Sequence, residues 1–210
     1  TDDAALRSAV DTAEQDILQK WEDSAFTADT WAAFMDAYDQ ARFMLDAATF
    51  TQEAIDEAAL ALNDAMDVLQ RRASEASISA LQAMVDKADA LGSDDEALNA
   101  AITAAKALLA DPDNASVTAV VSALLDLSEA MQALNTDESE DALRKDVQAT
   151  IDFIKENILT NVDNVRPGKV QALKDAVTAA QTVVDDPDAT ADELKAANKA
   201  MTKAAQELWE

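Results

Sequence analysis

Carboxylates are the most abundant side chains in this sequence that could do chemistry, with 42 Asp and Glu residues against 16 Lys and Arg. Glycoside hydrolysis uses two carboxyls that face each other across a cleft, one of them with a pKa raised by burial. Here the acids fall on the predicted exposed faces of helices that bury alanine and leucine, and nothing in the pattern builds a cleft. With so many acids, pairs at a catalytic spacing arise by chance. We therefore predict no catalytic residue and no enzyme activity in this chain, although a larger enzyme could contain it.

The absence of histidine and cysteine removes further classes of site. Ser-His-Asp and Cys-His arrangements are excluded, the commonest zinc ligand is missing, and no disulfide framework can form. The net charge of −26 disfavours the phosphate backbones of nucleic acids and anionic bilayers as partners. No apolar run approaches the roughly 18 residues that cross a bilayer. We expect no cofactor, no nucleic-acid partner and no direct membrane insertion.

Three loops carry clustered side-chain oxygens that could hold calcium: Asp111–Asn114, Asn161–Asn164 and Asp185–Asp188. All three lack the glycine turn and the closing glutamate of an EF-hand loop. Asp and Asn at such breaks also cap helices, which accounts for them without a metal. The sequence therefore predicts no metal site.

Aromatic residues are scarce and concentrated near the N-terminus. Trp31, Phe34 and Tyr38 recur at helical spacing and are expected in a core. Phe43 lies nine residues after Phe34, about half a turn off that stripe at 100° per residue, and Trp21 falls in a predicted loop. Exposed aromatics suit sugar stacking or protein contact, whereas packing against a neighbouring loop would leave Phe43 without such a role. Both residues are candidate ligand contacts.

Three lysines, Lys195, Lys199 and Lys203, follow one another at intervals of four near the C-terminus. Such a stripe is a candidate contact for an anionic polymer. Three lysines in an acidic surface do not make a dense patch, however, so an ordinary solvated helix face is the better interpretation.

The same pattern of apolar residues at helical spacing occurs three times in the sequence, which predicts tandem copies of one small unit. We place copy one at 1–72, copy two at 73–136 and copy three at 137–210. Copies one and three align at a constant offset of 139. Apolar pairs at this offset include Ala37 with Ala176, Ala41 with Ala180, Leu45 with Val184, Ile55 with Leu194, Leu62 with Met201, and Leu69 with Leu208.

Each copy shows three amphipathic helical stretches joined by short links, which predicts an all-α fold of antiparallel three-helix bundles. Start signals precede the helices, among them Thr51 before the third helix of copy one. The segments 93–96 and 190–193 both fit a capping box. Pro167 sits where a helix tolerates proline, just inside its first turn.

The junctions between copies contain neither glycine nor proline, so nothing in them must break a helix. We expect a stiff, elongated array in which the last helix of one copy can continue, with a bend, into the first helix of the next. Arg71 and Arg72, at the first junction, are candidate contacts between copies. Trp209 is a candidate contact with a module beyond the end of this sequence, which we interpret as a fragment because it lacks an initial Met.

The pattern in copies one and three resembles the FIVAR module. It is carried by Phe26-Thr27-Ala28-Asp29-Thr30-Trp31-Ala32-Ala33-Phe34, by Thr51-Gln52-Glu53, and by the stretch from Val183 to Leu194. Copy two departs most, with Asp95 where the others have Trp31 and Val170. FIVAR modules occur in large wall-attached or secreted proteins of Gram-positive bacteria, including adhesins and multimodular glycoside hydrolases.

The resemblance implies an extracellular, secreted or cell-wall-attached accessory array. We expect a non-catalytic spacer or adhesion module that holds a binding or catalytic head away from the cell wall. The alternative is a carbohydrate-binding module of a secreted glycoside hydrolase, which would repeat its exposed aromatics in every copy. Expected partners are host or cell-wall glycans, extracellular matrix protein, and neighbouring modules of the same monomeric polypeptide. An intracellular halophile protein would also be acidic, and only the resemblance argues against it.

Overall fold

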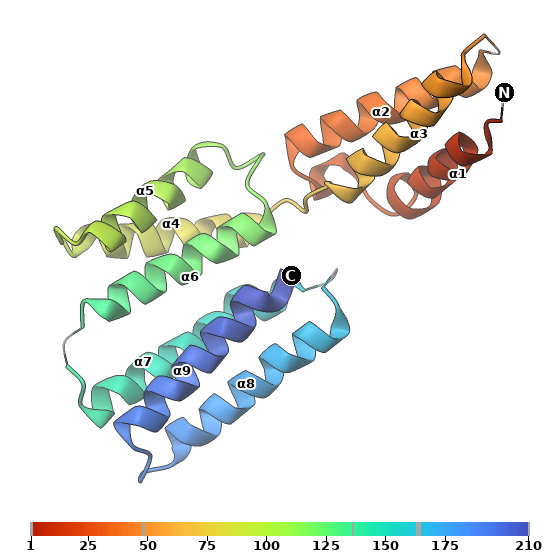
Figure 1. Cartoon of the computed structure of the whole chain (residues 1–210). Helices are drawn as coiled ribbons and strands as arrows, with labels where there is room; N and C mark the ends of the chain where they lie inside the picture. The colour runs from red at the N-terminus through yellow and green to blue at the C-terminus, as the bar shows by residue number, and fades with distance from the viewer. Residues whose placement is uncertain (1, 48, 136, 163–164, 210) are drawn as a thin grey trace. The chain divides into compact units, whose positions relative to one another are not determined.

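The computed structural model describes residues 2–47, 49–135, 137–162 and 165–209, with the backbone alone at Asn161 and Trp209. Its helices form three groups, and the only β contacts within these ranges are two isolated bridges. The described chain divides into two compact units. Unit 1 contains 1–73 together with 111–116, and unit 2 contains 74–110 together with 117–210. The predicted all-α fold is confirmed (Figure 1).

The first bundle belongs to unit 1 and is built from three helices (Figure 1). Helix α1 (Ala4–Thr12) continues into a π-helical stretch, η1 (Ala13–Leu18), and a short 3-10 turn, η2 (Asp23–Ala25), precedes α2 (Ala28–Asp46). Helix α3 (Gln52–Asp67) starts at Thr51, whose side chain accepts a hydrogen bond from the amide of Ala54. Its fully buried centre takes one large side chain from each helix: Leu6, Phe34 and Leu62.

Unit 2 contains the other two bundles. Copy two supplies α4 (Glu75–Ala90), α5 (Glu96–Ala110) and α6 (Val117–Ala133). Copy three supplies α7 (Glu140–Phe153), α8 (Pro167–Asp185) and α9 (Ala191–Gln206). A π-helical stretch, η3 (Ile154–Ile158), continues α7, and η4 (Leu159–Asn161) and η5 (Glu207–Trp209) are short 3-10 helices. Pro167 opens α8, as expected. None of the described helices is long and apolar enough to cross a membrane.

Copies two and three share apolar packing within unit 2. The core of copy three takes Ile151, Leu173 and Leu194 from its three helices, all fully buried. Val121 and Leu125 of α6 belong to the same buried cluster. Helix α6 therefore packs against copy three as well as against α4 and α5 of its own copy.

The expectation of helices that continue across the junctions is wrong. Helix α3 ends at Asp67 and α4 starts at Glu75, while α6 ends at Ala133 and α7 starts at Glu140. The physical reason is capping: the side chain of Ser74 accepts from the amide of Ser77, and that of Ser139 from the amide of Ala142. A serine acceptor at these positions starts a new helix even though no residue forbids the old one.

Of the two capping boxes predicted from the sequence, one is confirmed and the other is wrong. In copy three Thr190 and Glu193 form the predicted capping box, with both reciprocal hydrogen bonds present. In copy two the prediction is wrong by two residues, because Asp95 rather than Ser93 caps α5 and accepts from the amide of Leu98 at 2.8 Å. The side chain of Ser93 instead accepts from the amide of Asp95 at 3.1 Å.

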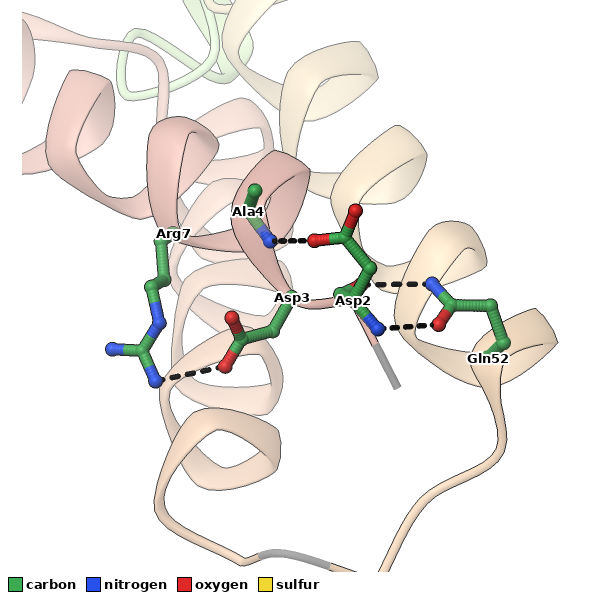
Figure 2. A network of polar contacts seen from close by, with 5 residues as sticks. All are labelled: Asp2, Asp3, Ala4, Arg7 and Gln52. Atoms are coloured by element: carbon green, nitrogen blue, oxygen red, sulfur yellow. Dashed lines mark hydrogen bonds and ion pairs between the residues drawn. The ribbon is translucent and has the colours of Figure 1, made fainter.

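The start of α1 is tied to α3 by a small polar network (Figure 2). Gln52 accepts from the amide of Asp2 at 2.7 Å and donates to the carbonyl of Asp2 at 2.8 Å. The Asp2 carboxylate accepts from the amide of Ala4 at 3.0 Å, and Arg7 pairs with Asp3 at 2.8 Å. Copy one therefore supplies an acceptor for the first amide of α1 from its own residues.

Candidate functional site

Five of the aromatic residues of copy one form a continuous series of ring contacts, which we call the stack. The ring centroids of Trp21 and Phe26 lie 6.4 Å apart in an edge-to-face arrangement, and those of Phe26 and Trp31 lie 5.5 Å apart with nearly parallel planes. The stack continues to Phe34 and Tyr38. These geometries are the ones that aromatic pairs prefer, so the stack contributes to stability beyond its buried area.

Arg71 joins this stack. Its guanidinium carbon lies 4.0 Å from the centroid of the Trp21 ring and 5.9 Å from that of Phe26. A cation over an aromatic face is held by the ring quadrupole. Trp21 is half-buried, and one of its faces is already occupied. The structure thus brings together Trp21, which we singled out for ligands, and Arg71, which we singled out for contacts between copies.

Arg72 contacts the segment 111–116, which lies in unit 1. Its guanidinium pairs with the carboxylate of Asp113. Its backbone forms an antiparallel bridge with Ser116 and donates to the carbonyl of Ala25 at 3.0 Å. The side chain of Trp209, the third predicted contact between modules, lies outside what the structure describes, and the backbone there ends η5.

Phe43 is 64% exposed on α2, which confirms that it lies off the core stripe. Its neighbour Met44 is buried instead. The ring of Phe43 meets that of Phe50 edge to face, with centroids 5.9 Å apart. Phe43 therefore contacts the loop after α2 and still presents most of its surface to solvent.

Lys195, Lys199 and Lys203 are all exposed on α9 and line a groove of about 650 Å³ in unit 2. Lys195 pairs with Glu138 at 3.0 Å, and Lys203 lies 3.8 Å from Glu207. The groove is walled by α6, α7 and α9, with Phe153 as its aromatic residue. Its acidic lining residues are Glu129, Asp137, Glu138 and Asp146.

The charges of this groove nearly cancel, since three lysines meet four carboxylates. That balance weakens the case for an anionic polymer as a ligand, because the acids would repel it. A neutral ligand with many hydrogen-bonding groups fits the lining better.

Polar side chains from two copies link across the groove. Gln132 of α6 donates to the hydroxyl of Thr150 at 3.1 Å and accepts from the amide nitrogen of Asn198 at 2.9 Å. The Oδ1 atom of Asn198 is buried and has no hydrogen-bond partner among the described residues. A buried acceptor without a donor is unfavourable for the stability of the fold.

Sequence reasoning missed Gln132, Thr150 and Asn198. None of the three belongs to a motif, and Gln132 lies 66 residues from Asn198 in the chain. Only the packing of α6 against copy three brings them together.

In the described residues no group of three or more Asp or Glu side chains gathers closely enough to hold a metal ion. The loop oxygens have partners of their own: Asp111 accepts from the side chain of Asn114 at 2.9 Å, and Asp186 accepts from the amide of Asp188 at 2.9 Å. The third loop, Asn161–Asn164, falls partly outside the described residues.

Comparison with known proteins identifies the family of this chain from its sequence. No solved structure matches the chain. The FIVAR domain matches it at residues 3–70, 77–135 and 146–208, which is nearly the whole sequence. These are the three bundles, and the match brings no catalytic domain with it. The chain therefore belongs to the FIVAR family, whose domain it carries in three tandem copies.

Proposed function

We propose that this array is a non-catalytic spacer in a secreted or cell-surface multimodular bacterial protein, where it holds a binding or catalytic head at a set reach from the cell wall. FIVAR modules are typical of such proteins. The observation that carries the proposal is the anchored exit from copy one. The amide of Thr27 donates to the carbonyl of Gln70 at 2.9 Å, and the amide of Arg72 donates to the carbonyl of Ala25 at 3.0 Å.

Anchoring of this kind supports a spacer rather than domains joined by a flexible linker. A Gly/Ser-rich linker behaves as a random coil whose end-to-end distance grows only as about the square root of its length. Residues 70–73 instead form backbone hydrogen bonds with the bundle that they leave, and Arg71 stacks on Trp21. The net charge of −26 also suits this role, because it keeps the array soluble and opposes self-association.

The spacer is tested by the spread of its end-to-end distance. The chain has no cysteine, so Ser8→Cys and Thr178→Cys, both at exposed positions, allow two spin labels to be placed without background. We expect a narrow distance distribution that broadens when a Gly-Ser segment is inserted between Ala73 and Ser74. The proposal would be contradicted if the distance distribution of the native array were as broad as that of the variant with the Gly-Ser insertion.

The spacer role can also be tested by a functional measurement that replaces the array with a flexible linker. With an enzyme or lectin head fused to the array on a bacterial surface, the native array should expose the head to a large soluble partner better than a Gly-Ser linker of equal residue number. Equal exposure with both would count against the spacer.

Carbohydrate binding is the second candidate, and the groove in unit 2 favours it. Amides and hydroxyls from Gln132, Thr150 and Asn198, together with Phe153, suit a neutral glycan. A glycan array probed with the whole chain should give signal that Asn198→Ala reduces. Lys174→Ala, an exposed lysine on α8 outside the groove, is the matched control. Signal that Asn198→Ala and Lys174→Ala leave equal would remove this candidate.

A further inference from the structure

Helix α2 starts without a side-chain cap from its own copy. Thr27 occupies the N-cap position, but its hydroxyl makes no cap hydrogen bond and pairs instead with the hydroxyl of Thr30 at 2.7 Å. The first amides of a helix have no partner within the helix and need acceptors from elsewhere. Within copy one, Asp2 and Thr51 supply side-chain acceptors for the first amides of α1 and α3, but no such acceptor comes from copy one for α2.

The missing acceptors come from the loop between α5 and α6. The amide of Ala28 donates to the carbonyl of Asp113 at 3.0 Å. The amide of Asp29 donates to the side-chain oxygen of Asn114 at 2.9 Å, across 85 residues of sequence. The side chain of Asn114 is oriented for this contact, because its amide nitrogen donates to the carboxylate of Asp111 at 2.9 Å.

The same loop pairs with the exit segment of copy one. The amide of Ala73 donates to the carbonyl of Ala115 at 2.9 Å, next to the bridge between Arg72 and Ser116. Ala115 is completely buried and Ser116 nearly so. Residues 111–116 accordingly belong to unit 1, although α5 and α6 on either side of them belong to unit 2.

We propose that the end of copy one is an acceptor surface for the segment Asp111–Ser116, and that this segment, donated by copy two, completes the fold of copy one. The folding unit of copy one then crosses the family boundary between residues 70 and 77. The inference goes beyond the spacer role and holds whether or not the array serves as a spacer.

Charge makes this acceptor surface specific to the end of copy one. At the offset of 65 that aligns Ser74 with Ser139, Arg72 of copy one corresponds to Asp137 of copy two. An acceptor end with Asp137 would repel an acidic loop, whereas Arg72 pairs with Asp113.

The loop of copy three also differs from the donor. It reads Asp186-Pro187-Asp188-Ala189, so alanine stands where copy two has Asn114. In place of an outside partner, Arg144 of α7 donates to the carbonyls of Val184 and Asp186 within copy three. Donor and acceptor therefore match only between copies one and two, which specifies the order of these two copies.

Cross-linking in the full chain tests the docking directly. Facing residues of an antiparallel bridge place their Cβ atoms about 4.5–5.5 Å apart, close to what a disulfide needs. Arg72→Cys with Ser116→Cys should oxidise to an intramolecular disulfide in most molecules. The matched control is Arg72→Cys with Asp94→Cys, in the other loop of copy two, which should give at most a tenth of that yield. Equal yields would overturn the proposal.

Hydrogen exchange in the full chain tests whether the donated segment stabilises copy one. Asn114→Ala should speed exchange of the amides of Ala28 and Asp29 about tenfold, the scale of a lost helix cap. Asn63→Ala, an exposed asparagine on α3, is the control and should leave these amides unchanged. Asn114→Ala with the same exchange rates as Asn63→Ala would also overturn the proposal. Neither measurement depends on end-to-end distance, so a failed spacer test leaves both informative.

Discussion

Arg71 covers one face of Trp21, with its guanidinium carbon 4.0 Å from the ring centroid. The two residues lie far apart in the sequence of copy one: Trp21 follows η1, and Arg71 follows α3, where the chain leaves the bundle. The exit segment of copy one thus packs on the aromatic stack through Arg71.

Trp21→Ala should therefore destabilise the protein rather than merely remove a ligand contact. In a double-mutant cycle with Arg71→Ala we expect a coupling of about 0.5–2 kcal/mol, the range of a partly desolvated cation–π pair. Urea unfolding followed by circular dichroism measures it. Two additive single effects would show that the stacking contributes nothing, and would leave Trp21 available for a ligand.

Phe43 and Phe34 give a second, sharper contrast on one helix. Phe34 is fully buried, so Phe34→Ala should destabilise by about 3–5 kcal/mol. Phe43 is 64% exposed, and Phe43→Ala should change stability by no more than about 0.5 kcal/mol. Thermal melts of both variants settle the comparison. A loss for Phe43→Ala as large as that for Phe34→Ala would make Phe43 part of the core and end its candidacy as a surface contact.

The sequence predicts those features of the structure that depend on residues close together in the chain. The three-helix copies, the opposite placement of Phe34 and Phe43, and the capping box at Thr190 all follow from spacings within one helix or one turn. The cap of α2 does not, because Asn114 lies 85 residues from Asp29. Nothing in a repeat pattern says that one copy lends a loop to another.

The prediction that helices continue across the junctions between copies failed for a related reason. We expected continuous helices because no glycine or proline interrupts them. Ser74 and Ser139 nevertheless start new helices, since a side-chain acceptor competes with helix continuation without forbidding it. In the groove, Gln132 and Asn198 meet only because α6 packs on copy three.

Tyr38 supplies a spectroscopic prediction, since it is the only tyrosine in the sequence. Burial, and then the hydrogen bond that its hydroxyl donates to Glu14 at 2.7 Å, raise the pKa of Tyr38 above its ordinary value. Titration of the tyrosinate absorbance should give a midpoint above about pH 10. Glu14→Gln should lower that midpoint, because it removes the negative charge beside the phenol, but burial should keep it raised.

The raised pKa also sets the sign of the effect on stability. The protonated phenol is favoured in the folded state, so its contribution is fully present below the unfolded pKa and is lost as pH rises through the folded pKa. The native chain should therefore lose stability above about pH 10. Tyr38→Phe should show less of this alkaline loss. A pH dependence unchanged in Tyr38→Phe would mean that other groups cause it.

Glu193 supplies the opposite case at acid pH. Its carboxylate accepts from both the amide and the hydroxyl of Thr190 at 2.8 Å, and these hydrogen bonds hold the pKa of Glu193 below its ordinary value. A lowered folded pKa contributes stability above the unfolded value, near pH 4.3, that is lost as pH falls through the folded pKa. Glu193→Ala should therefore lower the melting temperature at pH 7, and the difference from the native chain should shrink toward pH 2–3.

The control for this prediction is Glu53→Ala in the first turn of α3, where a glutamate occupies the helix start without a capping box. Both variants lose a negative charge near a helix N-terminus, which the helix dipole favours. Only Glu193→Ala also loses the hydrogen bonds to Thr190, so it should show the larger loss at pH 7 and the stronger dependence on pH. Identical melting curves for the two variants across this range would reduce the role of Glu193 to its charge alone.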